Sequence, residues 1–379
     1  MALIDLQVDP YAAVQDLTIS QRQMIEIARA LSANAKLIIM DEPNSSLAQS
    51  ESERLFAVID ALKARGIAII YVSHKIEEVL RISDRITVFR DGRYVGTVQR
   101  EDATEQKIIN MMVGRELDRT AISVPDKIGE LLLDVRNLVG PGFKNVSFQV
   151  RKGEIVAFSG LVGAGRSEVA GALFGARPFT AGEVIFDGRA VRFKSPKQAI
   201  RAGIAMVQED RKVLSLFMNM TIQHNITIAE LPYMRQFVTS DSAERRLARQ
   251  MIRAFDIRLA SLDDPVSSLS GGNQQKTVLG RWMATTPKLL ILDEPTHGVD
   301  VGAKADIYDL IRELAGQGMG VILISSELPE VLALAHRIVV MHEGRITGIL
   351  DRVDAGEERL MAHATGVVDD FAGTTEART

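Results

Sequence analysis

One segment of this 379-residue chain occurs twice, and the two copies are separated by a constant distance. Asp41 in LIIMDEP has its counterpart in Asp293 in LLILDEP, 252 residues later. The same offset holds without gaps over roughly 80 positions, which is far beyond what chance similarity produces. The chain therefore contains two copies of one folding unit. Other pairs at this offset are Leu17 and Leu269, Gln23 and Gln275, Arg29 and Arg281, Ser73 and Ser325, Val79 and Val331, Arg85 and Arg337, and Gly92 and Gly344.

The two copies differ in how much of the unit they contain. The second copy includes the glycine-rich segment GLVGAGRSE (160–168), whose counterpart in the first copy would precede Met1. We therefore expect the sequence to start inside the first copy, either as a fragment or with a lost or misassigned start. The expected organisation is a partial unit (1–115), a polar linker (116–130), a complete unit (131–350) and a C-terminal tail (351–379).

Short runs of Val, Ile and Leu alternate with amphipathic helical patterns through the second copy. GEIVAFSG and GVILISS are typical of buried strands, and KADIYDLIRELAG is typical of a helix that covers them. Strands that alternate with helices in this way predict an α/β fold with a mainly parallel sheet.

Composition excludes several classes of protein. The absence of cysteine rules out disulfides and cysteine-ligated zinc, and it suits a reducing compartment. A net charge of −4 argues against a general nucleic-acid-binding surface. The sequence has no apolar run near the ~20 residues that span a bilayer and no signal-peptide pattern. These features indicate a cytoplasmic globular protein.

GLVGAGRS matches the spacing of a phosphate-binding loop, with arginine where lysine is usual. A glycine-rich turn between strand and helix without a ligand would look similar, but the flanking strand and helix patterns favour function. Backbone N–H groups at a helix N-terminus hold phosphate oxygens, and Ser167 supplies a ligand for magnesium. The expected nucleotide-binding residues of this segment are Gly160, Leu161, Val162, Gly163, Ala164, Gly165, Arg166, Ser167 and Glu168.

Two further motifs carry chemistry. In LLILDEP, Asp293 ends a strand, where it can hold magnesium, and Glu294 is a candidate general base for water. Acidic helix caps are the alternative, but the recurrence at Asp41 and Glu42 favours function. In LSGGNQQK, a serine and two glycines precede a helix, so exposed N–H groups can hold a phosphate from outside the unit. The expected nucleotide-binding residues here are Ser270, Gly271, Gly272, Asn273 and Gln274.

Together these motifs resemble those of ATP-binding-cassette (ABC) ATPases. The tandem arrangement, GAGRSE, EDRK (209–212) and SSELPEV (325–331) resemble the double-cassette subunits of bacterial monosaccharide importers of the ribose/galactose/xylose type. The resemblance covers about 1–350 and implies a P-loop NTPase fold with a helical subdomain and N-terminal antiparallel strands. One cassette would be partial and one complete, and the cofactors would be ATP and Mg²⁺.

In that family each ATP lies between one cassette's phosphate loop and the other's signature segment. The resemblance therefore implies one site that uses the missing loop of the first copy, Asp41, Glu42 and the switch residue His74 opposite Ser270–Gly272. We expect this site to hydrolyse ATP in the full-length protein. The other site would join Gly160–Ser167, Asp293 and Glu294 to LTISQRQ (17–23). There Ile19 and Ser20 replace the glycines, Ser326 replaces the switch histidine and Ala48 replaces Asp300, so slow turnover is expected. The metal ligands implied are Asp41, Ser167, Gln208 and Asp293, and Gln208 would also connect the nucleotide to the membrane partner.

The resulting hypothesis is an ATPase on the cytoplasmic face of the inner membrane that drives a separate sugar permease. An extracytoplasmic sugar-binding protein would deliver the substrate, and two chains are expected to be able to pair through their complete cassettes. Two alternatives stay open. The chain is a catalytically weak, nucleotide-binding remnant, or it is a tandem ATPase acting on nucleic acid, which the short linker and the lack of cysteine disfavour.

Overall fold

The computed structural model describes residues 9, 11–14, 17–32, 35–41, 43–44, 49–73, 75–90, 92–113, 128–231, 240–299 and 301–367. The chain divides into two compact units, residues 1–117 and 118–379. Each unit has its own buried apolar clusters. Among the described residues, no helix has both the length and the apolar character needed to cross a membrane.

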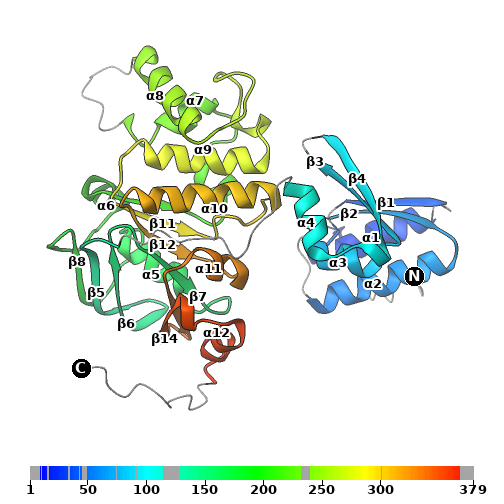
Figure 1. The fold of residues 1–379 in the computed structure, drawn as a ribbon, viewed down its shortest axis with the longest axis horizontal. Coiled ribbons are helices and arrows are strands. Elements are labelled where there is room, and N and C mark those ends of the chain that lie inside the picture. Colours follow the sequence, from blue (N-terminus) through cyan, green and yellow to red (C-terminus); the bar gives the residue numbers. More distant parts are fainter. Residues whose placement is uncertain are drawn as a thin grey trace. The chain divides into compact units, whose positions relative to one another are not determined.

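The second unit is built on a six-stranded sheet (Figure 1). Its first five strands in spatial order are parallel and the last is antiparallel to its neighbour. The central strands are fully buried, which explains why they are continuous apolar runs. The spatial order is β10 (Ile204–Val207), β11 (Leu289–Asp293), β12 (Gly320–Ile324), β7 (Ile155–Ser159), β13 (Arg337–His342) and β14 (Arg345–Asp351).

A second, antiparallel sheet belongs to the same unit. Its side chains share one buried cluster with β7, β11, β12 and the helix that follows β7, so this sheet covers one face of the large sheet. Its order is β6 (Phe143–Arg151), β5 (Leu131–Gly140), β8 (Ala181–Phe186) and β9 (Arg189–Val191).

Helices complete the second unit, and three of them, α7, α8 and α9, pack together as a helical part (Figure 1). The predicted α/β fold with a mainly parallel sheet, antiparallel strands and a helical subdomain is confirmed. The helices are α5 (Arg166–Leu173), α6 (Pro196–Ala202), α7 (Ile222–Thr227), α8 (Asp241–Ala254), α9 (Gly271–Met283), α10 (Val301–Gly316), α11 (Leu328–Leu334) and α12 (Glu357–Ala364), with single turns η3 (Arg211–Ser215), η5 (Val266–Ser268) and η6 (Arg352–Asp354).

The first unit repeats the last part of the second unit, element by element. Strand pairing shows the repeat most clearly, since Leu37 lies opposite Ala68 and Leu289 lies opposite Gly320. Both hairpins also have an irregularity at the same place, after Val88 and after Val340. The elements are α1 (Ile19–Ser32), β1 (Leu37–Asp41), α2 (Gln49–Ala64), β2 (Ala68–Val72), α3 (Ile76–Ile82), β3 (Arg85–Arg90), β4 (Arg93–Gln99), η2 (Arg100–Asp102) and α4 (Glu105–Val113).

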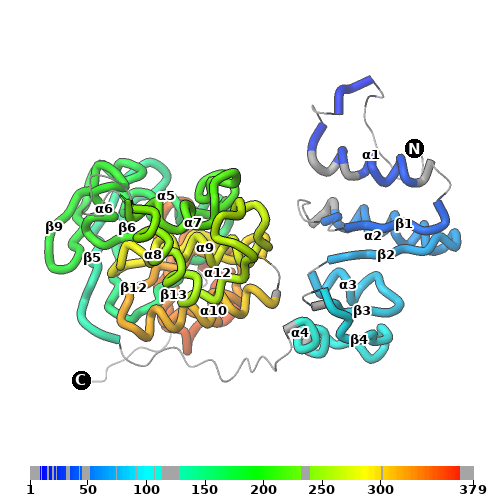
Figure 2. Tube along the Cα trace, turned by 90° about the horizontal axis from the view of Figure 1, so that it is seen from above, coloured from blue at the N-terminus to red at the C-terminus, as the bar shows by residue number. Residues whose placement is uncertain are grey.

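One face of the β1–β2 pair is uncovered. The other face packs against α2 in a buried cluster (Figure 2). On the uncovered face, Ile39 is 66% exposed and Ile70 is 47% exposed, whereas the counterparts of both are at most 2% exposed in the second unit. There the counterparts are buried against β5, β6, β7 and α5, and β7 also separates β12 from β13. The described residues of the first unit contain no equivalent of these covering elements.

Candidate nucleotide-binding site

The glycine-rich loop joins β7 to α5 in the second unit, as the sequence predicts. Gly160 and Gly165 have positive φ angles of 145° and 96°. A Cβ atom at Gly160 would lie 2.3 Å from the Met341 carbonyl oxygen, and one at Gly165 would lie 2.6 Å from that of Gly142. Both conformation and space therefore require glycine at these positions.

The loop residues between these glycines differ in their environments. The side chains of Leu161 and Val162 are exposed, and Gly163 has open space around its Cα. Ala164 is buried, and its carbonyl oxygen accepts a hydrogen bond from the Gly344 backbone. On the first turn of α5, Glu168 lies 3.8 Å from Arg177, so its carboxylate is paired within the unit. The crest of the loop at 161–163 is the part that is open to a ligand.

Ser167 and Asp293 join the loop to the end of β11. The Ser167 hydroxyl donates to the Asp293 carboxylate at 3.1 Å. Burial raises the pKa of Asp293 to about 6, although the hydrogen bond from Ser167 acts in the opposite direction. A hydroxyl and a carboxylate are oxygen ligands of the type that Mg²⁺ prefers. The residues present therefore fit a magnesium ion that is bound together with phosphate.

Gln208 follows β10, the strand next to β11, and its side chain is half-buried. Its neighbour Glu209 is close enough for its charge to raise the pKa values of both Asp293 and Glu294. The segment after β10 therefore reaches the same edge of the sheet as Ser167 and Asp293.

Arg166 is directed toward the interior of the unit. It is 8% exposed, and its guanidinium donates to the Ser325 carbonyl oxygen at 2.8 Å. It also lies 3.7 Å from the carboxylate of Glu294. The other oxygen of that carboxylate accepts a hydrogen bond from the Ser326 hydroxyl at 3.2 Å. Arg166 and Ser326 thus hold the candidate base from two sides.

Glu294 itself sits in an unusual backbone position, with φ at 47°. Left-handed backbone is uncommon for residues other than glycine and often marks functional sites. Burial raises the pKa of Glu294, while the hydrogen bonds from Ser326 and the charge of Arg166 oppose this rise. The structure therefore places Arg166, Ser167, Asp293, Glu294 and Ser326 together at one edge of the sheet.

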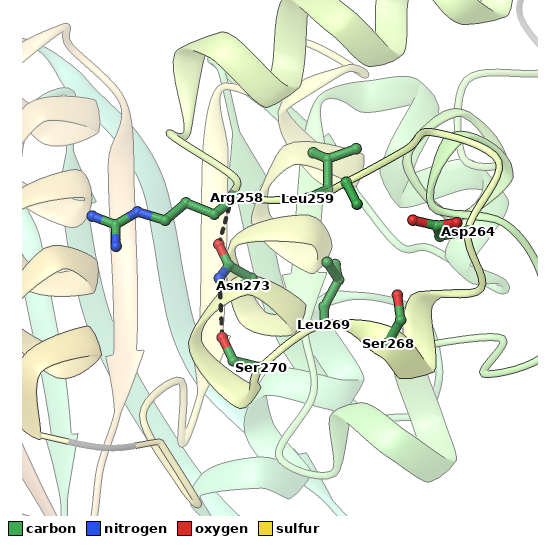
Figure 3. A pocket seen from close by; sticks show the side chains of 8 residues that line it. Arg258, Leu259, Asp264, Ser268, Leu269, Ser270 and Asn273 are labelled. Carbon is green, nitrogen blue, oxygen red and sulfur yellow. Dashed lines mark hydrogen bonds between the residues drawn. The ribbon is translucent and has the colours of Figure 1, made fainter. Parts of the chain in front are cut away.

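The signature segment begins α9, with Ser270 at the N-cap position. The Asn273 side chain donates to the Ser270 hydroxyl at 3.0 Å and accepts from the backbone N–H of Arg258 at 2.8 Å (Figure 3). Gln274 is buried and donates to the Leu269 carbonyl oxygen. An open hollow of about 480 Å³ lies beside them, lined by Arg258, Leu259, Ala260, Asp264, Ser268, Leu269, Ser270 and Asn273 (Figure 3).

Both signature glycines have a packing role within their own unit. A Cβ atom at Gly272 would lie 2.5 Å from that of Ala303, and one at Gly271 would lie 2.9 Å from the guanidinium of Arg211. Sequence reasoning explained these glycines by close approach to a phosphate and missed the contacts inside the unit. In the first unit α1 begins at the counterpart of Gly271, which is Ile19.

The predicted site of the first unit is only partly visible. Asp41 ends β1 and is exposed. Glu42 and His74 lie outside the described residues, as do Ala48 and Asp300. The roles of these residues therefore stay predictions.

Comparison with known proteins identifies the class of protein to which the second unit belongs. The ABC transporter family matches residues 143–297, which include the glycine-rich loop, the signature segment and Asp293–Glu294. A solved nucleotide-free ATP-binding cassette of an ABC transporter has the same fold, with a TM-score of 0.53 and 24% identity over 64% of this chain and 96% of its own. The second unit is thus an ATP-binding cassette.

Longer relatives define the family more closely. The ribose import ATP-binding protein RbsA of Geobacillus kaustophilus is 47% identical over 368 residues, which is 96% of this chain and 74% of the relative. A putative ribose/galactose/methyl galactoside import ATP-binding protein of Hahella chejuensis is 47% identical over 94% of this chain and 70% of its own length. The chain therefore belongs to the family of ABC importer ATP-binding proteins that includes these two. The predicted family is confirmed.

Proposed function

We propose that this protein is the ATPase subunit that drives sugar uptake through a separate membrane permease. Support comes from the relatives, whose names specify import of ribose, galactose or methyl galactoside at 47% identity. We further propose that it works on the cytoplasmic face of the inner membrane, and that an extracytoplasmic sugar-binding protein supplies the permease. Binding to nucleic acid is not part of this proposal.

The contact between Ser167 and Asp293 carries the nucleotide part of the proposal. The loop N–H groups at the start of α5 would hold phosphate oxygens, because the positive end of a helix favours anions. Ser167, Asp293 and Gln208 would hold Mg²⁺, which would neutralise charge on the phosphates. The signature segment Ser270–Gln274 would complete the site of a neighbouring cassette, in the same chain or in a second copy.

We propose that the second unit binds nucleotide but turns it over slowly. A general base must reach the proton that it removes. The carboxylate of Glu294 is instead held by Ser326 and lies beside the Arg166 guanidinium. Ser326 also lacks the capacity of histidine to carry charge. Faster hydrolysis is assigned, by resemblance, to Asp41, Glu42 and His74.

Binding of a fluorescent ATP analogue to the full chain tests the nucleotide site. Ser167→Ala should weaken binding about tenfold in the presence of Mg²⁺ and change it little in EDTA, because only the metal ligand is lost. Ser195→Ala is the matched control, since Ser195 caps α6 without a side-chain hydrogen bond. Equal affinities of Ser167→Ala and wild type with Mg²⁺ would contradict the proposed site.

Phosphate release then separates the two functional hypotheses. If the second unit contributes little turnover, Glu294→Gln should change the ATPase rate of the chain by less than about twofold. A chain that binds the analogue but releases no phosphate would support the remnant hypothesis. Uptake of labelled ribose and galactose in cells lacking the gene, with and without the restored wild-type chain, tests transport.

A further inference from the structure

The EDRK segment contains a buried arginine that connects three functional segments. Arg211 begins the π-helical turn η3, three residues after Gln208, and is 9% exposed. Its Nη1 donates to the His297 carbonyl oxygen at 2.8 Å, and its Nη2 donates to that of Gly298 at 2.9 Å. These two residues lie in the loop that follows Asp293 and Glu294. The side chain therefore joins the segment after Gln208 to the loop after the candidate base.

The chemistry of the link requires arginine. Two consecutive carbonyl oxygens accept from the two ends of one planar guanidinium, which the single ammonium of lysine cannot reproduce. The partners in the loop are backbone atoms, so the link depends on the loop's conformation and not on its side chains. Two backbone hydrogen bonds within the loop stabilise this conformation. The His297 N–H donates to the Glu294 carbonyl oxygen, and the Val299 N–H donates to the Thr296 carbonyl oxygen.

The signature segment packs against this link. A Cβ atom at Gly271 would lie 2.9 Å from Nη2 of Arg211 and 3.4 Å from the Gly298 carbonyl oxygen. A side chain at this position would therefore collide with the hydrogen bond between Arg211 and Gly298. The first turn of α9 thus contacts both ends of the link.

The turn η3 is also fixed at its other end. Arg281, on α9, donates to the carbonyl oxygens of Ser215 and Asn225 and to the Asn225 side chain. Asp210 caps the turn by accepting from the N–H groups of Lys212 and Val213. The turn is thus held at both ends, by Asp210 and Arg211 at its start and by Arg281 at Ser215.

We propose that Arg211 is a positioning residue that couples residues 208–215 to residues 295–299 and to the first turn of α9. The three segments then move as one body when nucleotide binds. The consequence for nucleotide rests on the proposed function, whereas the link itself is testable without nucleotide.

Hydrogen exchange of the full chain, without nucleotide, tests the link. Arg211→Met keeps an unbranched apolar stem but removes the guanidinium and its donors, so the amides of His297 and Val299 should exchange about tenfold faster or more. Arg281→Met is the matched control, because it removes a second buried guanidinium that binds a carbonyl oxygen of the same turn, that of Ser215, and the carbonyl oxygen of Asn225 on α7. It should speed exchange around Ser215 and Asn225 and leave His297 and Val299 within about twofold of wild type.

Arg211→Lys is the second variant, and it covers the case in which Arg211→Met does not fold. It keeps the charge and can still donate, but its single nitrogen lacks the planar two-nitrogen geometry that matches both carbonyl oxygens, so exchange at His297 and Val299 should be intermediate. The inference is overturned if neither Arg211 variant changes exchange at these two amides, or if Arg281→Met changes them equally. With the ATP analogue and Mg²⁺, wild type should gain protection in all three segments, and Arg211→Met should gain it only at the glycine-rich loop. If the wild-type chain gains no protection anywhere when the ATP analogue and Mg²⁺ are added, the proposed nucleotide site is refuted. The comparison of the variants without nucleotide would still test the Arg211 link.

Discussion

The uncovered face of the β1–β2 pair predicts that one substitution has unequal effects at two equivalent positions. Ile291, on β11, is fully buried against the antiparallel sheet and α5, so Ile291→Ala removes buried methyl groups and leaves an enclosed cavity. Such changes cost about 2–5 kcal/mol, and we expect about 3 kcal/mol here. Ile39, its counterpart on β1, is 66% exposed, so only about a third of its surface is buried in the folded chain. Its truncation therefore removes little buried surface and leaves no enclosed cavity. Its replacement by alanine should cost less than about 1 kcal/mol.

Urea unfolding can assign each cost to its unit. Trp282 is the single tryptophan of the chain and packs edge-on against Phe174 at 5.9 Å, so its fluorescence reports the second unit. Hydrogen exchange of the β1 and β2 amides in the same urea series reports the first unit. If Ile39→Ala lowers the free energy of unfolding of the first unit by about 3 kcal/mol, that face is covered in solution and the reasoning from its exposure is wrong.

Two further predictions concern the second unit. Burial raises the pKa of Asp293 to about 6, so the folded protein keeps the proton of this carboxyl group to higher pH than the unfolded chain does. The free energy of unfolding therefore falls as pH rises from about 4 to 6 and stays lower above that range. Asp293→Asn should therefore raise the free energy of unfolding by roughly 2–3 kcal/mol at pH 8 and by about half as much at pH 5, as measured by urea unfolding; an equal gain at both pH values would contradict this. Gly272→Ala should lower the free energy of unfolding by about 1–3 kcal/mol because of its collision with Ala303. Gly280→Ala in the same helix, where the new Cβ would make an ordinary 3.5 Å contact, should raise it by up to about 1 kcal/mol, and thermal shifts of the same sign would refute the argument.

The repeat and the apolar pattern predicted the fold because both depend on backbone periodicity. Fully buried parallel strands need unbroken apolar runs, so β7, β11 and β12 were visible as GEIVAFSG, LLILDEP and GVILISS. A constant offset between copies also fixes strand register, and this explains why the pairing of β1 with β2 matches that of β11 with β12. The glycine-rich loop and Asp293 were predictable together, since parallel strands place their carboxyl ends at one edge.

Side-chain direction was not predictable in the same way. Arg166 has the spacing of a phosphate-binding residue, but its guanidinium bonds to Ser325, which is 159 residues away in the chain. Arg211 bonds to His297 and Gly298, which are 86 and 87 residues away in the chain, and no local pattern distinguishes it from a surface arginine. Both contacts depend on how loops from different strands meet at one sheet edge, which only the folded structure specifies. The one sequence signal was the EDRK motif itself, which resemblance identified without assigning a role.

The two copies also show how a repeated scaffold can diverge electrostatically without a change of backbone. Glu330 is fully buried on α11, accepts a hydrogen bond from Thr296 at 3.0 Å and has its pKa raised to about 7 by burial. Its counterpart Glu78, on α3, instead accepts from the Tyr71 hydroxyl at 2.7 Å and lies 3.4 Å from the ammonium of Lys75.

In both copies a carboxyl group lies on the helix that follows the switch position. In the second copy its hydroxyl partner Thr296 belongs to the loop after the Asp-Glu-Pro segment. In the first copy Lys75 makes the connection, because it also donates to the Asn44 carbonyl oxygen at 3.1 Å. Burial raises the pKa of Glu330 and so favours its neutral form, although the hydrogen bonds from Ser325 and Thr296 act in the opposite direction. In each copy the helix after the switch position is therefore linked to the loop after the Asp-Glu-Pro segment, through the Thr296 hydroxyl in the second copy and through the Lys75 ammonium in the first.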